Sequence, residues 1–81
     1  MSVVRPVTEF PALKANKVLR MLRRIGYRPV RQSGSHVRLE AEGRKSILFS
    51  THAGKEVPPR HLRDMLIHRA GLSDQEIDAV L

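Results

Sequence analysis

The sequence has no cysteine, no tryptophan and only one tyrosine and two phenylalanines in 81 residues. Without cysteine, the chain forms no disulfide and offers no thiolate to a metal. With so few aromatic side chains, it is poorly supplied for stacking RNA bases on an aromatic platform. No apolar run approaches the roughly 20 residues of a membrane span, and the N-terminus lacks the charged and apolar regions of a signal peptide. We therefore expect a soluble, cytoplasmic protein without a membrane partner.

Positive charge, by contrast, is abundant and concentrated. The net charge is +7, and residues 14–32 alone carry seven basic residues and no acidic one, which equals the whole excess. Such a segment is typical of a surface that binds a polyanion such as RNA. It is equally typical of a surface that only keeps a protein soluble, and charge alone does not separate the two.

Hydrophobic periodicity predicts a helix over residues 13–25 that ends at Gly26. Its apolar positions share one face (Ala15, Val18, Met21, Leu22 and Ile25). Its opposite face carries Lys17, Arg20 and Arg24.

Three strands are predicted next, over 27–32, 36–42 and 45–51, joined by tight turns at Ser33-Gly34-Ser35 and Glu42-Gly43-Arg44. Pro29 lacks an amide donor, which favours an edge strand. Strict alternation in the second strand turns Val37, Leu39 and Ala41 toward the core and His36 and Arg38 toward the other face.

Residues 52–57 are predicted to form a loop and residues 60–70 a second helix, stopped by Gly71. A capping box, Ser73 to Glu76, begins a short last helix whose Ile77, Val80 and Leu81 are expected to reach the core. The order α-β-β-β-α predicts an α+β domain of double-stranded-RNA-binding type, a three-stranded antiparallel sheet with helices on one face. We expect this single domain over 13–81, preceded by an N-terminal arm, 1–12.

His36 follows a glycine turn and belongs to the open sheet face, which makes it a candidate for proton transfer near neutral pH. Arg38, two positions away, could hold a phosphate. RNA carries its own nucleophile, the 2′-hydroxyl, so a ribonuclease without a metal needs only a base, an acid and cations. An exposed histidine is nevertheless more often without a role, and the pattern leaves both alternatives open.

The remaining histidines give weaker signals. His52 opens the stretch that contains Lys55, and a plain surface loop is the simpler interpretation. His61 and His68 lie seven positions apart, so helical periodicity places both on one flank of the second helix, facing solvent or a partner. The spacing of the four histidines matches no metal site, and we expect none.

An ordered set of motifs then resembles the HicA-type (YcfA-like) messenger-RNA interferases, toxins of a bacterial toxin–antitoxin system. The set is Ile25-Gly26-Tyr27 after a basic helix, Arg31-Gln32-Ser33-Gly34-Ser35-His36, His52-Ala53-Gly54-Lys55-Glu56, and Arg69-Ala70-Gly71-Leu72-Ser73. Two departures occur: Val37 stands where many members have a second histidine, and Phe49-Ser50-Thr51 and Ala53 replace the usual residues around His52.

The resemblance implies a double-stranded-RNA-binding-like fold and cleavage of messenger RNA, which stops translation. It implies that His36 is catalytic, that Gly34 and Ser35 form the turn that places it, and that no cofactor is needed. It also implies neutralisation by a HicB-type antitoxin.

The first hypothesis is therefore a metal-independent endoribonuclease toxin whose RNA-binding residues are Lys17, Arg20, Arg24, Arg38 and Lys55. The identity of the second proton-transfer group stays open: the candidates are His52, Lys55, water and a group supplied by the setting of the substrate, such as the ribosome. The alternative is a non-catalytic RNA-binding module of the same fold. A domain whose basic helix docks an acidic protein is a third hypothesis.

Overall fold

The computed structural model describes residues 5–50 and 55–81. The helix predicted over 13–25 is present as α1 (Ala15–Arg24), and Leu13 and Lys14, which the prediction included, lie outside it. Ala15, Val18 and Leu22 are buried along one side, as their spacing requires, whereas Ile25 lies just past the helix end and is half-buried. Gly26 has a positive φ of 105°, a conformation that glycine adopts without steric cost and that turns the chain toward the sheet.

The three predicted strands form one antiparallel sheet in the order β2-β3-β4, with β2 at Arg28–Ser33, β3 at His36–Glu40 and β4 at Ile47–Ser50. In β3, Val37 and Leu39 are buried and their neighbours are exposed, so the predicted alternation is confirmed. The strand β2 is an edge strand, as Pro29 suggested, and its pairing with β3 is irregular between Pro29 and Arg31.

The prediction of a loop over 52–57 is wrong for its last residues. Glu56–Val57 form a short strand, β5, which pairs antiparallel with β1 (Leu13–Lys14), and the amide of Ala15 donates to the carbonyl of Lys55 at 2.9 Å. A two-residue strand is too short to show a period in the sequence, so only its partner reveals it.

The second helix is α2 (Pro59–Arg63), which continues without a break as a π-helical segment, Asp64–Arg69. At the C-terminal end of that segment, the amide of Ala70 donates to the carbonyl of Met65, five residues back, at 2.8 Å. The predicted capping box is confirmed at the start of α3 (Asp74–Val80), where Ser73 and Glu76 bond each other's backbone amides. The expectation that Leu81 reaches the core is wrong, because Leu81 follows the last turn of α3 and is exposed.

Arg44, in the turn between β3 and β4, joins the sheet to both C-terminal helical segments. Its guanidinium donates to the carbonyl of Ala70 at 2.7 Å and to the carboxylate of Glu76 at 2.8 Å. The amide of Ser73 and the Arg44 guanidinium both donate to this carboxylate, and together they lower the pKa of Glu76. The C-terminal segment is thus fixed by polar contacts as well as by the buried side chain of Ile77.

The sequence ahead of β1 contributes to the domain as well. A single 3-10 turn, η1 (Val7–Glu9), precedes Phe10, which is buried with the core residues. Arg5 is paired with Asp78 at 2.7 Å, and its carbonyl accepts from the Arg63 guanidinium at 2.6 Å. The hydrogen bond to the Asp78 carboxylate, together with the nearby charges of Glu9 and Asp74, raises the pKa of Arg5 further above its ordinary value.

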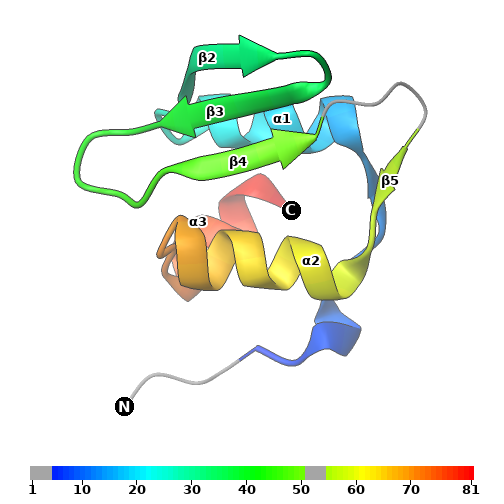
Figure 1. Cartoon of the computed structure of the whole chain (residues 1–81). Helices are drawn as coiled ribbons and strands as arrows, with labels where there is room; N and C mark the ends of the chain where they lie inside the picture. Colours follow the sequence, from blue (N-terminus) through cyan, green and yellow to red (C-terminus); the bar gives the residue numbers. More distant parts are fainter. Residues whose placement is uncertain (1–4, 51–54) are drawn as a thin grey trace.

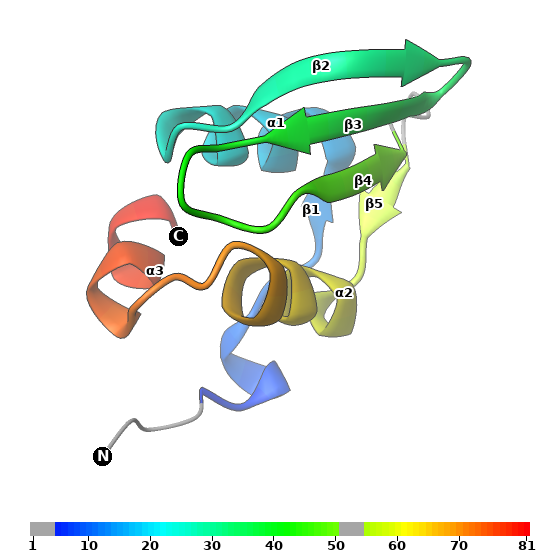
Figure 2. The same cartoon turned by 60° about the vertical axis from the view of Figure 1, so that its left-hand side comes forward.

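Figures 1 and 2 show α1 behind the sheet, with α2 and α3 below it, so the helices bury their apolar sides in one core on one side of the sheet. The core holds Tyr27 as well, whose hydroxyl donates to the carbonyl of Lys45 at 2.7 Å and whose pKa is raised by burial. No helix of the described residues covers the other face of the sheet, which we call the open face. Across residues 5–50 and 55–81, no helix is long and apolar enough to cross a bilayer.

Candidate functional site

His36 is placed by the two-residue turn that joins β2 to β3. Ser33 and His36 pair across the hairpin, leaving Gly34 and Ser35 as the turn. Gly34 has a φ of 59° at the first turn position, the conformation that a type II′ hairpin turn needs and that favours glycine. The side-chain amide nitrogen of Gln32 (Nε2) also donates to the Gly34 carbonyl at 3.1 Å. His36 is therefore the first strand residue after a defined turn, and its side chain is exposed on the open face.

Strand register gathers cations around this face. Residues paired directly across antiparallel strands share a face, so Arg31 and Arg38 lie side by side on the open side. Like charges in that position repel each other and are destabilising unless an anion lies between them. Arg38 is partly compensated by Glu40 at 3.3 Å and by a 3.4 Å bond to the Ser46 hydroxyl. The sequence predicted Arg38 but not Arg31, because the bulged register that pairs them is not visible in the chain.

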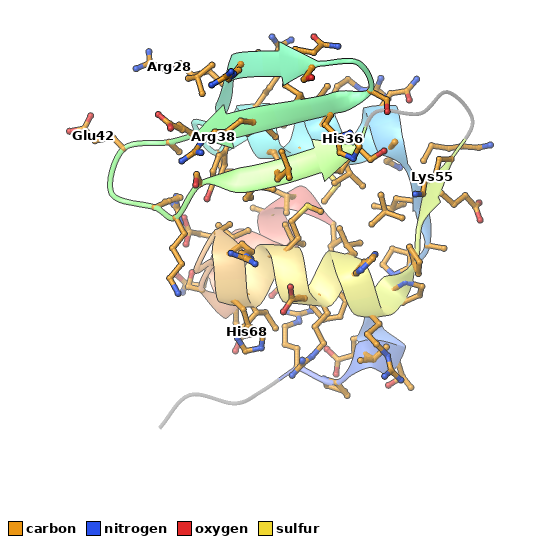
Figure 3. The ribbon with its side chains drawn as sticks, in the orientation of Figure 1. Arg28, His36, Arg38, Glu42, Lys55 and His68 are labelled. Atoms are coloured by element: carbon orange, nitrogen blue, oxygen red, sulfur yellow. The ribbon has the colours of Figure 1, made fainter. Side chains whose placement is uncertain are left out.

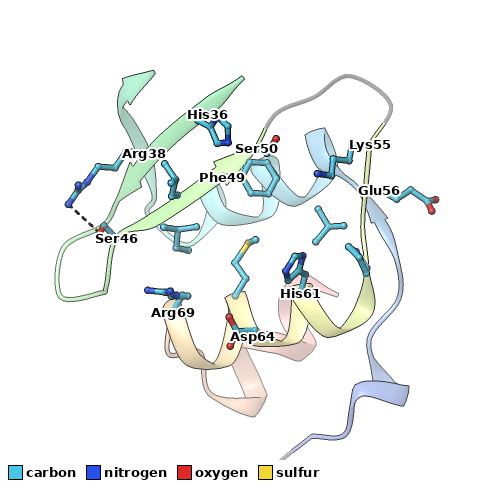
Figure 4. A pocket seen from close by; sticks show the side chains of 15 residues that line it. His36, Arg38, Ser46, Phe49, Ser50, Lys55, Glu56, His61, Asp64 and Arg69 are labelled. Carbon is cyan, nitrogen blue, oxygen red and sulfur yellow. Dashed lines mark hydrogen bonds between the residues drawn. The ribbon is translucent and has the colours of Figure 1, made fainter. Parts of the chain in front are cut away.

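A groove of about 550 Å³ opens between the outer edge of β4 and α2, and its lining includes His36, Arg38 and Lys55. Figure 4 shows these side chains around one hollow, with Lys55 pointing into it from the position just before β5. A volume of this size falls within the range of ligand-binding clefts, about 300–1,000 Å³. The structure thus brings together three of the predicted site residues: His36 and Arg38 from β3, and Lys55 from the position just before β5.

The helical wall of the groove adds residues that the sequence did not assign to a site. His61 from α2 and Arg69 from the π-helical segment line it, together with the carboxylate of Asp64. The groove is therefore mixed in charge: its lining holds cations together with one carboxylate from the helical wall, Asp64, and one from β5, Glu56. No sequence motif identifies these residues as part of a site, because they share the groove with His36 only in the folded domain.

The prediction that His61 and His68 share one flank of the helix is wrong. His61 lines the groove and His68 does not, and Figure 3 shows His68 directed away from the sheet. Seven residues make nearly two turns of an α-helix, which would align the two histidines. The π-helical segment, which begins after His61 and contains His68, takes more residues per turn, so His68 is rotated away from His61.

The predicted RNA-binding residues do not form one surface. Lys17, Arg20 and Arg24 are exposed on α1, and α1 packs on the opposite side of the sheet from His36. None of the three lines the groove. Two separate basic regions result, one around the groove and one along the outer side of α1.

His52, predicted as a candidate for proton transfer, lies outside the described residues, as do Ala53 and Gly54 of the same motif. In the described part of the chain, no group of three or more histidine, aspartate and glutamate side chains is arranged to hold a metal ion. The side chains at the groove can bind an anion and exchange protons.

The fold and the groove define a class: a small basic α+β domain with the arrangement of double-stranded-RNA-binding domains and imidazoles beside its open face. The family model described as the HicA toxin of bacterial toxin–antitoxin systems matches residues 15–72, which is more than half of the chain. The chain belongs to this family and is a toxin of a toxin–antitoxin system, which implies an antitoxin partner. Among curated proteins no match was found, and no solved structure matched either.

Proposed function

We propose that this toxin is a metal-independent endoribonuclease that cleaves messenger RNA in the cytoplasm and so inhibits translation. The observation that carries the proposal is the position of His36, exposed at the exit of the Gly34 turn and lining a groove with Arg38 and Lys55. Membership of the HicA family supports it.

In the proposed reaction the groove binds the phosphodiester through Arg38 and Lys55. A base removes the proton of the 2′-hydroxyl, and the 2′-oxygen forms a bond to phosphorus. The bond from phosphorus to the 5′-oxygen breaks, and an acid protonates that oxygen. The products are a 2′,3′-cyclic phosphate and a 5′-hydroxyl, and His36 serves as one of the two proton-transfer groups. The arginine and lysine stabilise the negative charge that develops on the phosphoryl oxygens.

The test is to express the wild type and His36→Ala in a bacterial host and follow growth and messenger-RNA integrity. We expect arrest and cleavage with the wild type, and a loss of about 10²–10⁴-fold in cleavage rate with His36→Ala, the usual contribution of a proton-transfer group. His68→Ala is the matched control, because His68 is exposed and lies outside the groove. Equal cleavage by wild type and His36→Ala would show that His36 is not catalytic.

Gly34 and Ser35 belong to the proposal as the turn that positions His36. Gly34→Ala strains the turn, since an alanine at a φ of 59° is disfavoured, and we expect slower cleavage with RNA binding retained. Cleavage by the purified wild type should persist when EDTA is added. His52 stays a candidate second proton-transfer group in this scheme.

The second candidate function is an RNA-binding module without catalysis, favoured by the exposed cations of α1. Wild-type protein that binds RNA and leaves it intact would establish it. Replacing Lys17, Arg20 and Arg24 together by glutamine should reduce the salt dependence of RNA binding by about one unit of slope per lost phosphate contact. Arg38→Gln and Lys55→Gln are the matching variants for the groove. Comparing the salt dependence of RNA binding between the two sets of variants shows which basic region binds the RNA.

The remaining partners follow from the same proposal. A HicB-type antitoxin should abolish cleavage when mixed with the toxin at equal concentration. Cleavage of a naked transcript, compared with the same transcript during translation, shows whether the ribosome is part of the substrate.

A further inference from the structure

We infer that His61 is the second proton-transfer group of the site, acting with His36 on the same phosphodiester. This inference rests on the proposed function and deepens it, because strand cleavage by transesterification requires both a base and an acid and one histidine cannot serve as both at once.

The first argument is placement. His36 comes from β3 and His61 from α2, separated by 25 positions along the chain, yet both line one groove. Figure 4 shows the His61 ring rising from α2 toward the sheet, with the His36 ring above it on the far wall and Lys55 to one side. A phosphodiester held in this groove would have an imidazole on each side, the arrangement that lets one ring take a proton while the other gives one.

The second argument is chemistry. Imidazole is the side chain whose ordinary pKa lies near neutral pH, so two imidazoles in one site can be neutral and protonated at the same time. In the forward step the neutral ring gains the 2′-hydroxyl proton and the protonated ring loses one to the 5′-oxygen. The number of protons on the pair is unchanged, and a hydrolysis of the cyclic phosphate in the opposite sense would restore the starting state.

The third argument is that the helix is built to turn His61, and not His68, toward the groove. Both side chains are exposed, and regular α-helical winding would place them on one flank. The π-helical segment Asp64–Arg69 begins after His61 and contains His68, and of the two histidines only His61 lines the groove. Local π-helical winding is frequent at functional sites, which agrees with a helix shaped around a site.

The experiment compares His61→Gln and His61→Ala with His36→Ala and with the matched control His68→Ala, using purified proteins and a short single-stranded RNA. We expect cleavage to fall by about 10²–10⁴-fold in both His61 variants and to stay within twofold of wild type in His68→Ala. Thermal unfolding should match the wild type in every variant, because the replaced side chains are exposed.

A substrate with sulfur in place of the bridging 5′-oxygen then assigns the roles. A thiolate leaves without being protonated, so this substrate restores cleavage to the variant that lacks the acid and to no other. We expect cleavage to be restored to one of the two variants, His36→Ala or His61→Ala, and not to the other.

The wild-type pH–rate profile should be bell-shaped, with each variant losing one limb. The other charged groups facing the groove are Arg38, Lys55, Glu56, Asp64 and Arg69, and all stay unchanged in these variants.

The outcomes separate the two proposals. A wild type that cleaves no RNA overturns the proposed function. A wild type that cleaves, with His61→Ala equally active, overturns only the role of His61. The role of His61 is also overturned if the sulfur substrate restores cleavage to neither variant or to both. It is overturned as well if His52→Ala or Lys55→Ala removes a limb of the pH–rate profile while His61→Ala keeps both limbs.

Discussion

Phe10 lies ahead of the first strand, outside the residues that the family model matches, yet it is 4% exposed and belongs to the core. Replacing a buried phenylalanine by alanine costs about 3–5 kcal/mol, from the lost burial and the cavity that remains. We expect the lower end, about 3 kcal/mol, because η1 is short and can partly close the cavity. A domain of this size has roughly 4–12 kcal/mol of stability in total, so Phe10→Ala should remove a large part of it.

The assay is urea unfolding followed by circular dichroism, supported by thermal melting, in which each kcal/mol shifts Tm by about 4–8 °C in a small domain. Phe10→Leu nearly conserves volume and should cost less than about 1.5 kcal/mol. Leu48→Ala is the control for a large apolar side chain that is 71% exposed, and it should change stability by no more than about 0.5 kcal/mol. A Phe10→Ala protein as stable as Leu48→Ala would refute the conclusion that the sequence ahead of β1 is part of the core.

Three further predictions concern the polar contacts that hold the fold. Arg44→Met should lower Tm by about 4–8 °C, the effect of roughly 1 kcal/mol, because the carbonyl of Ala70 loses its charged donor. The folded-state pKa of Glu76 is lowered, so the ionised carboxylate stabilises the fold above its ordinary pKa, and this contribution is lost as pH falls through the folded value. In urea unfolding at pH 7 and pH 3, Glu76→Gln should therefore lose less stability than the wild type between the two pH values. An equal loss of stability in the two proteins would contradict this. Tyr27→Phe should cost about 1 kcal/mol through the lost bond to the carbonyl of Lys45. Burial raises the pKa of this single tyrosine, so stability should decline as pH rises through the alkaline range, and the phenolate absorbance of the folded wild type should appear at higher pH than that of the unfolded chain.

Much of the fold could be predicted from periodicity and from turn residues. The apolar period of three and four residues identified α1, and the alternation around Val37 and Leu39 identified β3 together with the face on which His36 lies. Gly34 marked the hairpin, and Ser73 with Glu76 marked the start of α3. These features are local, because each depends on residues within a few positions of one another and on backbone preferences that a neighbour far along the chain does not change.

The short pairing of β1 with β5 could not be predicted in this way, and neither could the burial of Phe10. Each depends on a partner many residues away: Leu13 pairs with Val57, and Phe10 joins a core supplied by the whole chain. The π-helical segment was missed for a related reason. The sequence predicts one continuous helix over 60–70, and the backbone bond from Ala70 to Met65 is one residue longer than that pattern implies.

The candidate site likewise has a part that depends on local sequence and a part that depends on distant residues. By itself, the sequence determined that His36 follows a glycine turn with Arg38 on the same face, because alternation and turn chemistry act over a few residues. Only the tertiary structure decided which other residues meet them: it brought Lys55 and His61 into the groove and placed Lys17, Arg20 and Arg24 on the opposite side of the sheet. The physical reason is that β4 and α2 are held in place by side chains buried in one shared core, and that core draws on residues from the whole chain, which no short stretch of sequence contains.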